Sequence, residues 1–267
     1  FVGTGNTMTG QCAFLADTTV VDEEGVPIPV QLTIQDALTL QTLATSSAEA
    51  VSVSMDGEII IAGYGSTKRA NRAFVTTVLD ATTDPITLSS TILPMLGGGK
   101  YAEAYAMTPD GLVIAGRCDS PKGPVACIWF VDATTGEWVI KEIGSLSKKS
   151  KDAVATGIAW RPGSAVGELI VVGRSKTILY ESEAFVWTGN PTLEEDEIGY
   201  FYDLEYILTK TGAGEASLMG SSWILEEATG ISAAGDRIVG YGINPERGQE
   251  AWLVTNYPYD ELVFTHE

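Results

Sequence analysis

The sequence predicts an all-β protein, a β-propeller of five blades with up to four antiparallel strands each and a first blade that is incomplete at its N-terminus. An apolar strand ending in glycine recurs along the chain, a strand with an Ala-aromatic-aliphatic pattern follows it, and turns rich in Gly, Pro, Asp and Asn separate them. These glycines recur every 53 to 67 residues, close to the period of propeller and solenoid repeats. We call them the marker glycines: Gly3, Gly63, Gly116, Gly173 and Gly240.

The strand that ends in the marker glycine is the most regular element. Continuous apolar runs such as residues 59–62 indicate strands covered on both faces, as between two packed sheets. Their Val and Ile content, and the Phe and Trp of the strands that follow, favour strand over helix. The chain begins with a fifth version of this strand at residues 1–5.

Two further strands complete each repeat. The third strand begins with alanine at five places, and the opening strand, rich in small residues, is present at four. Because the blades of a propeller converge, we expect the opening strands to be innermost. The third strands begin at Ala13, Ala73, Ala126, Ala184 and Ala251, and the opening strands at Ala50, Ala104, Ala155 and Ala228.

The repeat divides a single domain, residues 1–267, into units of approximately 1–45, 46–98, 99–147, 148–222 and 223–267. Outer fourth strands are expected at residues 30–34 and 261–265. The first unit has no opening strand before residues 1–5, which leaves an inward strand edge to be covered. We expect a neighbouring copy or an upstream segment, rather than the C-terminal tail, to cover it.

Asp-Gly pairs at residues 56–57 and 110–111 join the first two strands of the second and third units. This dipeptide favours a hairpin turn with positive φ. Catalytic or calcium-binding carboxylates are the alternative, and turn chemistry is the favoured interpretation. The segment Asp132-Ala-Thr-Thr-Gly-Glu-Trp138 resembles the turn of quinoprotein-type propeller repeats.

The fourth unit departs most from the pattern. Its first hairpin loop is lengthened at residues 161–167, and Glu194, Glu195, Asp196 and Glu197 follow its third strand. This run neither alternates ligands nor contains a turn glycine, so an exposed acidic loop is favoured over a calcium site. Residues 208–225, rich in Gly and Ser, are the best candidate for a mobile loop.

The composition excludes several classes of protein. Of the 267 residues 45% are hydrophobic, enough to bury a sizeable core. Thirty-five acidic and 16 basic residues give a net charge of −19, which repels nucleic-acid phosphates. No run approaches 18 uncharged apolar residues, so no transmembrane segment is predicted. Nucleic acid and membrane-spanning roles are therefore not expected.

The three cysteines are too few for a disulfide scaffold and do not have paired zinc-ligand spacing. Cys118 and Cys127 fall on neighbouring predicted strands. They form either a cross-strand disulfide or two buried thiols, and Cys12 has no obvious partner.

We assign no catalytic, metal-binding or cofactor-binding residue, and no cofactor. The only histidine, His266, stands next to the C-terminus, which disfavours histidine-dependent catalysis. A glycoside hydrolase needs converging carboxylates, whereas the innermost strands are expected to carry small and aliphatic residues. Trp129, Trp187 and Trp252 are expected to pack between blades rather than to stack on sugars.

The pattern Ala-x-Gly-Ile-Ser, Ile-Val-Gly-Tyr and Glu-Ala-Phe/Trp-x-Trp resembles the HAF-type extracellular repeat family. The resemblance covers nearly the whole chain and is clearest at residues 155–187 and 228–254. It departs at residues 104–107 and at Cys127, which replaces the aromatic residue. The resemblance implies a secreted or surface-attached bacterial or archaeal protein with a propeller-like fold, and it implies no catalytic residues.

Two classes of function follow. The favoured one is a non-enzymatic extracellular or cell-surface propeller that mediates binding to a protein, to a polysaccharide or to other copies of itself. The alternative is a propeller-fold hydrolase acting on carbohydrate.

Overall fold

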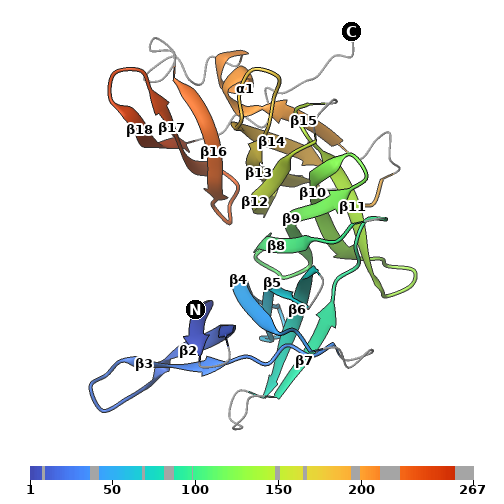
Figure 1. Cartoon of the computed structure of the whole chain (residues 1–267), viewed down its shortest axis with the longest axis vertical. Helices are drawn as coiled ribbons and strands as arrows, with labels where there is room; N and C mark the ends of the chain where they lie inside the picture. The colour runs from blue at the N-terminus through green and yellow to red at the C-terminus, as the bar shows by residue number, and fades with distance from the viewer. Residues whose placement is uncertain are drawn as a thin grey trace. The chain divides into compact units, whose positions relative to one another are not determined.

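The computed structural model has five antiparallel sheets of three or four strands (Figure 1). It describes residues 1–7, 10–36, 42–67, 70–80, 87–97, 99–147, 151–164, 167–193, 199–210 and 223–255. The prediction of an all-β protein with antiparallel sheets of up to four strands is confirmed. The chain divides into two compact units, residues 1–121 with 128–140 and residues 122–127 with 141–267.

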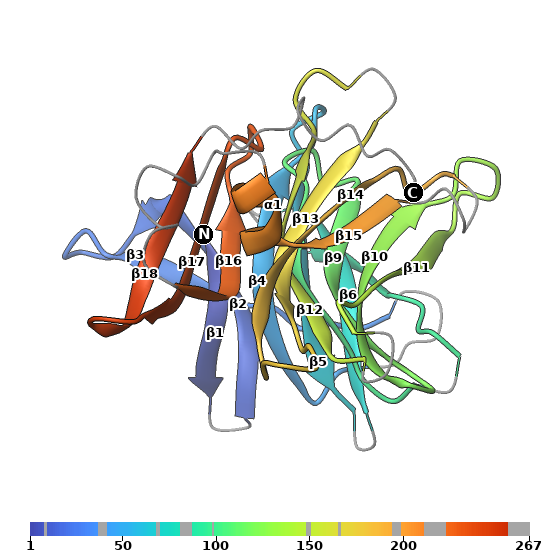
Figure 2. The same cartoon turned by 90° about the horizontal axis from the view of Figure 1, so that it is seen from above.

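The first sheet has the order β1-β2-β3 (Figure 2), with strands β1 (Val2–Thr7), β2 (Gly10–Val21) and β3 (Pro27–Gln31). The outer strand predicted at residues 30–34 is β3 and lies three residues earlier. Its prolines lack an N–H, which an edge strand tolerates. In the described part of the chain β1 forms the other edge, and residues 261–265 lie outside the described residues.

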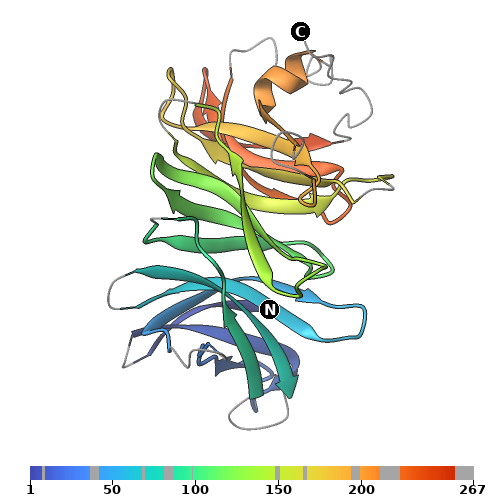
Figure 3. The same ribbon diagram turned by 90° about the vertical axis from the view of Figure 1, so that its right-hand side faces the viewer.

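The second sheet contains β4 (Thr45–Val53), β5 (Ile59–Ser66), β6 (Asn71–Asp80) and β7 (Thr87–Ile92). It lies on the first sheet as a successive layer (Figure 3). Their shared core consists of aliphatic side chains and one phenylalanine. Its members include Ala13, Leu15, Leu32, Ile34, Ile61 and Phe74.

The third sheet contains β8 (Ala102–Met107), β9 (Val113–Ser120), β10 (Gly123–Val131) and β11 (Trp138–Gly144), in chain order. Within the first unit, β8 contacts β4, β5 and β6. The first strand of one sheet therefore lies against the sheet that precedes it.

The fourth sheet contains β12 (Ala153–Trp160), β13 (Leu169–Ser175), β14 (Glu183–Gly189) and β15 (Gly199–Asp203). The aromatic run at residues 200–202 therefore belongs to an outer fourth strand. This strand follows the acidic segment that interrupts the repeat in the sequence.

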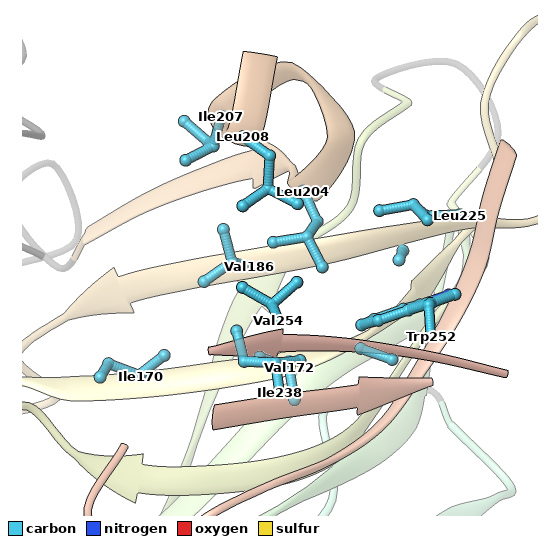
Figure 4. Packing of buried hydrophobic residues seen from close by; sticks show 12 residues of the cluster. Ile170, Val172, Val186, Leu204, Ile207, Leu208, Leu225, Ile238, Trp252 and Val254 are labelled. Atoms are coloured by element: carbon cyan, nitrogen blue, oxygen red, sulfur yellow. The ribbon is translucent and has the colours of Figure 1, made fainter. Parts of the chain in front are cut away.

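The fifth sheet contains β16 (Ile224–Ile231), β17 (Arg237–Asn244) and β18 (Gly248–Thr255). Strand β16 contacts β12, β13 and β14. The first strand of the fifth sheet therefore lies against the fourth sheet, as the first strands of the second and third sheets lie against the sheets before them. Figure 4 shows Ile238, Trp252 and Val254 of the fifth sheet facing Val172 and Val186 of the fourth.

One helix, α1 (Leu204–Lys210), differs from the all-strand prediction; it follows β15 and contacts β14, β15 and β16. Leu204, Ile207 and Leu208 are buried and share one helix face. Asp203 caps the N-terminus of this helix. Its Oδ1 accepts hydrogen bonds from the backbone N–H groups of Glu205, at 2.8 Å, and Tyr206, at 3.3 Å. The start of the expected mobile loop is therefore helical, and residues 211–222 lie outside the described residues.

A β-bulge explains four of the five marker glycines, those of the second to fifth sheets. The first strand of each of these sheets has a bulge beside the residue that pairs with the marker glycine. A Cβ on any of these glycines would lie 2.0 Å from a backbone carbonyl oxygen of that strand, closer than atoms approach. The close pairs are Gly63 with Ser47, Gly116 with Glu103, Gly173 with Val154, and Gly240 with Glu227.

An aromatic ring covers the same glycine from the third strand. Three of these four glycines have as Cα partners aromatic residues whose rings lie within 3.0 Å of the Cβ position. The bulge and the ring together exclude any side chain, so the repeat needs glycine here. The ring-bearing residues are Phe74, Phe185 and Trp252.

The Asp-Gly turns form as predicted, with φ of 84° at Gly57 and 76° at Gly111. The amide of Gly111 donates to the carbonyl of Thr108, whose hydroxyl accepts from the amide of Val113 at 3.0 Å. Asp110 accepts a hydrogen bond from the amide of Leu112 at 3.1 Å, which is a turn role.

The Asp132 turn is held in a related way. Backbone hydrogen bonds from Thr135 and Thr134 lower the pKa of Asp132. The carboxylate therefore stays ionised and serves the turn, as in other Asx-turns.

Cys118 and Cys127 are buried free thiols, the second of the two alternatives. Burial raises the pKa of Cys118, and its Sγ accepts a hydrogen bond from the amide of Leu96 at 3.4 Å. A buried thiol with a raised pKa is poorly reactive and behaves as a small apolar group.

Trp129, Trp187 and Trp252 are buried, which confirms their packing role. The indole N–H of Trp129 donates to the carbonyl of Pro94 at 2.8 Å. No described helix is long and apolar enough to span a membrane.

Candidate functional site

The expectation that the opening strands lack acidic residues is wrong. Glu49 lies on β4, Glu103 on β8, and Glu226 and Glu227 on β16. The repeat pattern places the start of each opening strand at an alanine, whereas β4, β8 and β16 begin earlier in the chain. The four glutamates precede these alanines, and Glu49 lies at the bulge of β4. A bulge interrupts the alternation of side chains between the two faces of a strand, so a simple alternating pattern does not include these residues.

Glu103 is the centre of a polar cluster in the first unit. Its Oε1 accepts a hydrogen bond from the side-chain amide Nδ2 of Asn71 at 2.7 Å, and its Oε2 accepts one from the Tyr105 hydroxyl at 2.5 Å. The Nε of Arg117 lies 3.5 Å from the same Oε2. Both carboxylate oxygens of this buried residue are thus engaged, and its charge is paired.

Two tyrosines adjoin this cluster. The rings of Tyr64 and Tyr105 meet edge to face, with centroids 5.7 Å apart. Burial raises the pKa of both phenols, and the hydrogen bond to Glu103 raises that of Tyr105 further. The charges of Glu49 and Glu103 also raise the pKa of Tyr64. Both phenols therefore remain neutral and can donate hydrogen bonds at physiological pH.

A polar pocket of about 450 Å³ lies beside the cluster, where strands β1, β2, β4, β5 and β6 meet. Ser47 donates to Glu49 Oε1 at 2.5 Å, and its hydroxyl also contacts that of Thr4. The described lining residues carry hydroxyl, amide, phenol and carboxylate groups and include neither Lys nor Arg. They are Thr4, Gln11, Thr45, Ser46, Ser47, Glu49, Tyr64, Gly65, Ser66 and Asn71.

The second unit contains a related cluster around Glu227. The Tyr241 hydroxyl donates to Glu227 Oε2 at 2.9 Å, and the Nε of Arg174 lies 3.3 Å from that oxygen. Burial and this hydrogen bond raise the pKa of Tyr241. Arg117, Arg174 and Tyr241 each follow a marker glycine. Glu103 and Glu227 are the strand partners of this residue in the third and fifth sheets, where the fourth sheet has a valine. Of the two clusters, that of Glu103 adjoins the pocket.

Three carboxyl groups near helix α1 form a separate acidic cluster. Burial raises the pKa of Glu183, Asp203 and Glu205, and the charge of Asp203 raises the pKa of the other two further. A carboxyl with a higher pKa in the folded state binds protons more tightly when folded. Its contribution to stability therefore falls as the pH rises through the window between the unfolded pKa, near 4, and the raised folded pKa.

We expect Asp203→Asn to weaken this fall in stability while keeping the helix cap, because asparagine caps a helix as well as aspartate does. The measurement is urea unfolding from pH 4 to pH 7. Glu246→Gln, at an exposed turn residue, is the matched control and should leave the pH dependence unchanged. An unchanged profile for Asp203→Asn would show that its burial does not control stability.

No group of three His, Cys, Asp or Glu side chains suited to a metal ion occurs among the described residues. The acidic run at residues 194–197 and His266 lie outside them. The expectation that this run holds no high-affinity calcium therefore stays a prediction.

No model of a known protein family matches the chain, and no curated protein sequence is significantly similar to it.

Proposed function

We propose that the protein is a non-enzymatic extracellular or cell-surface β-propeller that binds a neutral polysaccharide in the polar pocket of its first unit. The observation that carries this proposal is the lining itself. Serine and threonine hydroxyls both donate and accept hydrogen bonds, as do sugar hydroxyls. Its volume of about 450 Å³ falls within the usual range for small-ligand sites, and Tyr64 adds an aromatic ring.

The charges of the site favour a neutral sugar over an acidic one. Glu49 is an exposed lining residue of the pocket, and Glu103 accepts a hydrogen bond from the lining residue Asn71. A uronic acid or a phosphorylated sugar would approach these carboxylates without a cation from the described lining, at an unfavourable Coulomb energy.

Binding is favoured over hydrolysis because of how Glu103 is held. A carbohydrate hydrolase needs one carboxyl group that can donate a proton and a second that acts as base or nucleophile. Glu103 already accepts hydrogen bonds from Asn71 and Tyr105 and pairs with Arg117. This leaves Glu49 as the only carboxylate among the described lining residues.

The propeller arrangement is supported by the packing of consecutive sheets within each unit, with the first strand of each later sheet against its predecessor. The resemblance to HAF-type repeats supports an extracellular or cell-surface location. The propeller arrangement and the extracellular or cell-surface location are therefore both parts of the proposed function.

We expect an array of neutral oligosaccharides, containing glucans, mannans and N-acetylglucosamine oligomers, to give binding that uronic acid oligomers do not give. Tyr64→Phe and Asn71→Ala should each weaken the binding about five- to tenfold in calorimetry, roughly the contribution of one hydrogen bond. Tyr241→Phe, which removes the equivalent phenol in the second unit, is the matched control and should bind normally.

The outcome also separates the two classes of function. Release of reducing sugar from any bound oligosaccharide would establish the hydrolase alternative. Binding that survives in both pocket variants would place the carbohydrate elsewhere. The absence of binding across the array would contradict the proposal and favour a protein partner.

A further inference from the structure

Within each unit, the same two kinds of sheet face meet where consecutive sheets pack together. In the second unit Trp252, which lies over Gly240, belongs to the same buried cluster as Val172 and Val186 of the fourth sheet (Figure 4). We call the side of a sheet that bears this ring its aromatic face. The opposite side, which bears the third-strand alanine and its aliphatic neighbours, is the alanine face.

The first unit follows the same rule. Phe74 lies over Gly63 on the second sheet and shares a core with Ala13 and Leu15 of the first sheet. In both units, therefore, the aromatic face of one sheet meets the alanine face of the sheet before it. The interface is directional, with a different surface on each side.

The aromatic face of the first sheet has no such cover in the described part of the chain. Phe14 lies over Gly3 as the other rings lie over their glycines, yet it is only half-buried. Phe1 meets it edge to face at 6.4 Å and is 59% exposed. A largely apolar pocket of about 360 Å³ opens on these rings, lined also by Ala16, Pro27 and Pro29.

The alanine face of the fifth sheet is exposed as well. Leu253 and Val239 are partners across β17 and β18 and are 55% and 44% exposed. Their equivalents in the fourth sheet, Val186 and Val172, are partners in the same way and are both 0% exposed. The residues keep the apolar character of a buried interface although they are at the surface.

We propose that the propeller does not close on itself, and that the aromatic face of the first sheet instead binds the alanine face of the fifth sheet of a second copy. The fit is that of the interface already present within each unit, where a ring over a marker glycine meets an alanine face. Because the two surfaces differ, the contact is heterologous, and its repetition builds chains or rings. The net charge of −19 opposes association, so moderate salt should strengthen it.

The test uses sedimentation velocity of the full chain over a range of protein concentrations, at low and moderate salt. The wild type should associate with rising concentration. Leu253→Asp and Phe1→Asp should each raise the dissociation constant at least about tenfold, because either change places a carboxylate in an apolar contact. Both side chains are exposed in the free chain, so folding should be unaffected; far-UV circular dichroism checks this.

Mixing the two variants gives the decisive result. Leu253→Asp keeps an intact aromatic face, and Phe1→Asp keeps an intact alanine face. Together they should form one-to-one dimers that grow no further. Met55→Asp, at an exposed turn residue, is the control and should associate as the wild type does.

A wild type that stays monomeric at all concentrations would overturn the proposal. So would a monomer in which Leu253→Asp lowers the unfolding midpoint, since the fifth sheet would then be covered by its own chain. Association that both variants retain would assign the interface to another surface. This inference does not depend on carbohydrate binding, which the variants should preserve.

Discussion

Gly173→Ala is expected to destabilise the protein by more than about 3 kcal/mol, although it adds a single methyl group. The new Cβ would lie 2.0 Å from the carbonyl oxygen of Val154 and 2.9 Å from the ring of Phe185. Both neighbours sit in a packed interior, where overpacking costs about 1–3 kcal/mol and more when backbone must move. Denaturant unfolding followed by tryptophan fluorescence measures the change.

Gly3→Ala is the matched control. This marker glycine belongs to the first sheet, and the three atoms nearest to its Cβ would all belong to the ring of Phe14, the closest at 2.8 Å. A half-buried ring can shift, so we expect a loss of about 1 kcal/mol. Equal losses at Gly3 and Gly173 would show that the bulge carbonyl is not what requires glycine.

Phe185→Ala is the second change with a large expected effect. Its ring is buried, stacks on Phe201 with centroids 4.2 Å apart, and covers the Gly173 position. Removing a buried phenylalanine side chain typically costs 3–5 kcal/mol because the cavity closes only in part. Chemical unfolding should show that loss. Phe14→Ala, at the equivalent residue of the first sheet, should cost clearly less because that ring is half-buried.

The double variant Gly173→Ala with Phe185→Ala separates the two constraints on the glycine. Removing the ring relieves the contact at 2.9 Å but leaves the carbonyl of Val154 in place. We expect the double variant to be less stable than Phe185→Ala alone. A double variant as stable as Phe185→Ala would mean that the ring, and not the bulge, excludes a side chain.

The sequence predicted those features of the fold that depend on local patterns. The marker glycines, the apolar strands around them and the Asp-Gly turns each have a strict local requirement, and the structure has strands and turns at these places. Helix α1 was not predicted, although an Asp203 cap is followed by Leu204, Ile207 and Leu208 at helical spacing. A helix of seven residues spans only about two turns, too few for its period to stand out from the strand-like patterns beside it.

The candidate site was harder to predict, for a physical reason. Glu103 precedes the alanine of its repeat, and its partner Asn71 lies on another sheet. The bulge in β8 shifts the alternation of side chains, so the sequence alone does not tell which face Glu103 occupies. The pocket is likewise formed by strands of two sheets, and its lining depends on their packing rather than on any motif.

Strand order in the five described sheets follows the chain without a crossover. Every ladder hydrogen bond within a sheet therefore closes a short loop, which lowers the entropy cost of forming it. A sheet can form before residues far away in the sequence have folded, and neighbouring sheets then pack onto it through side-chain contacts, as in linear repeat proteins. Such a module can be duplicated, deleted or moved to the other end of the chain by cutting only a connecting segment.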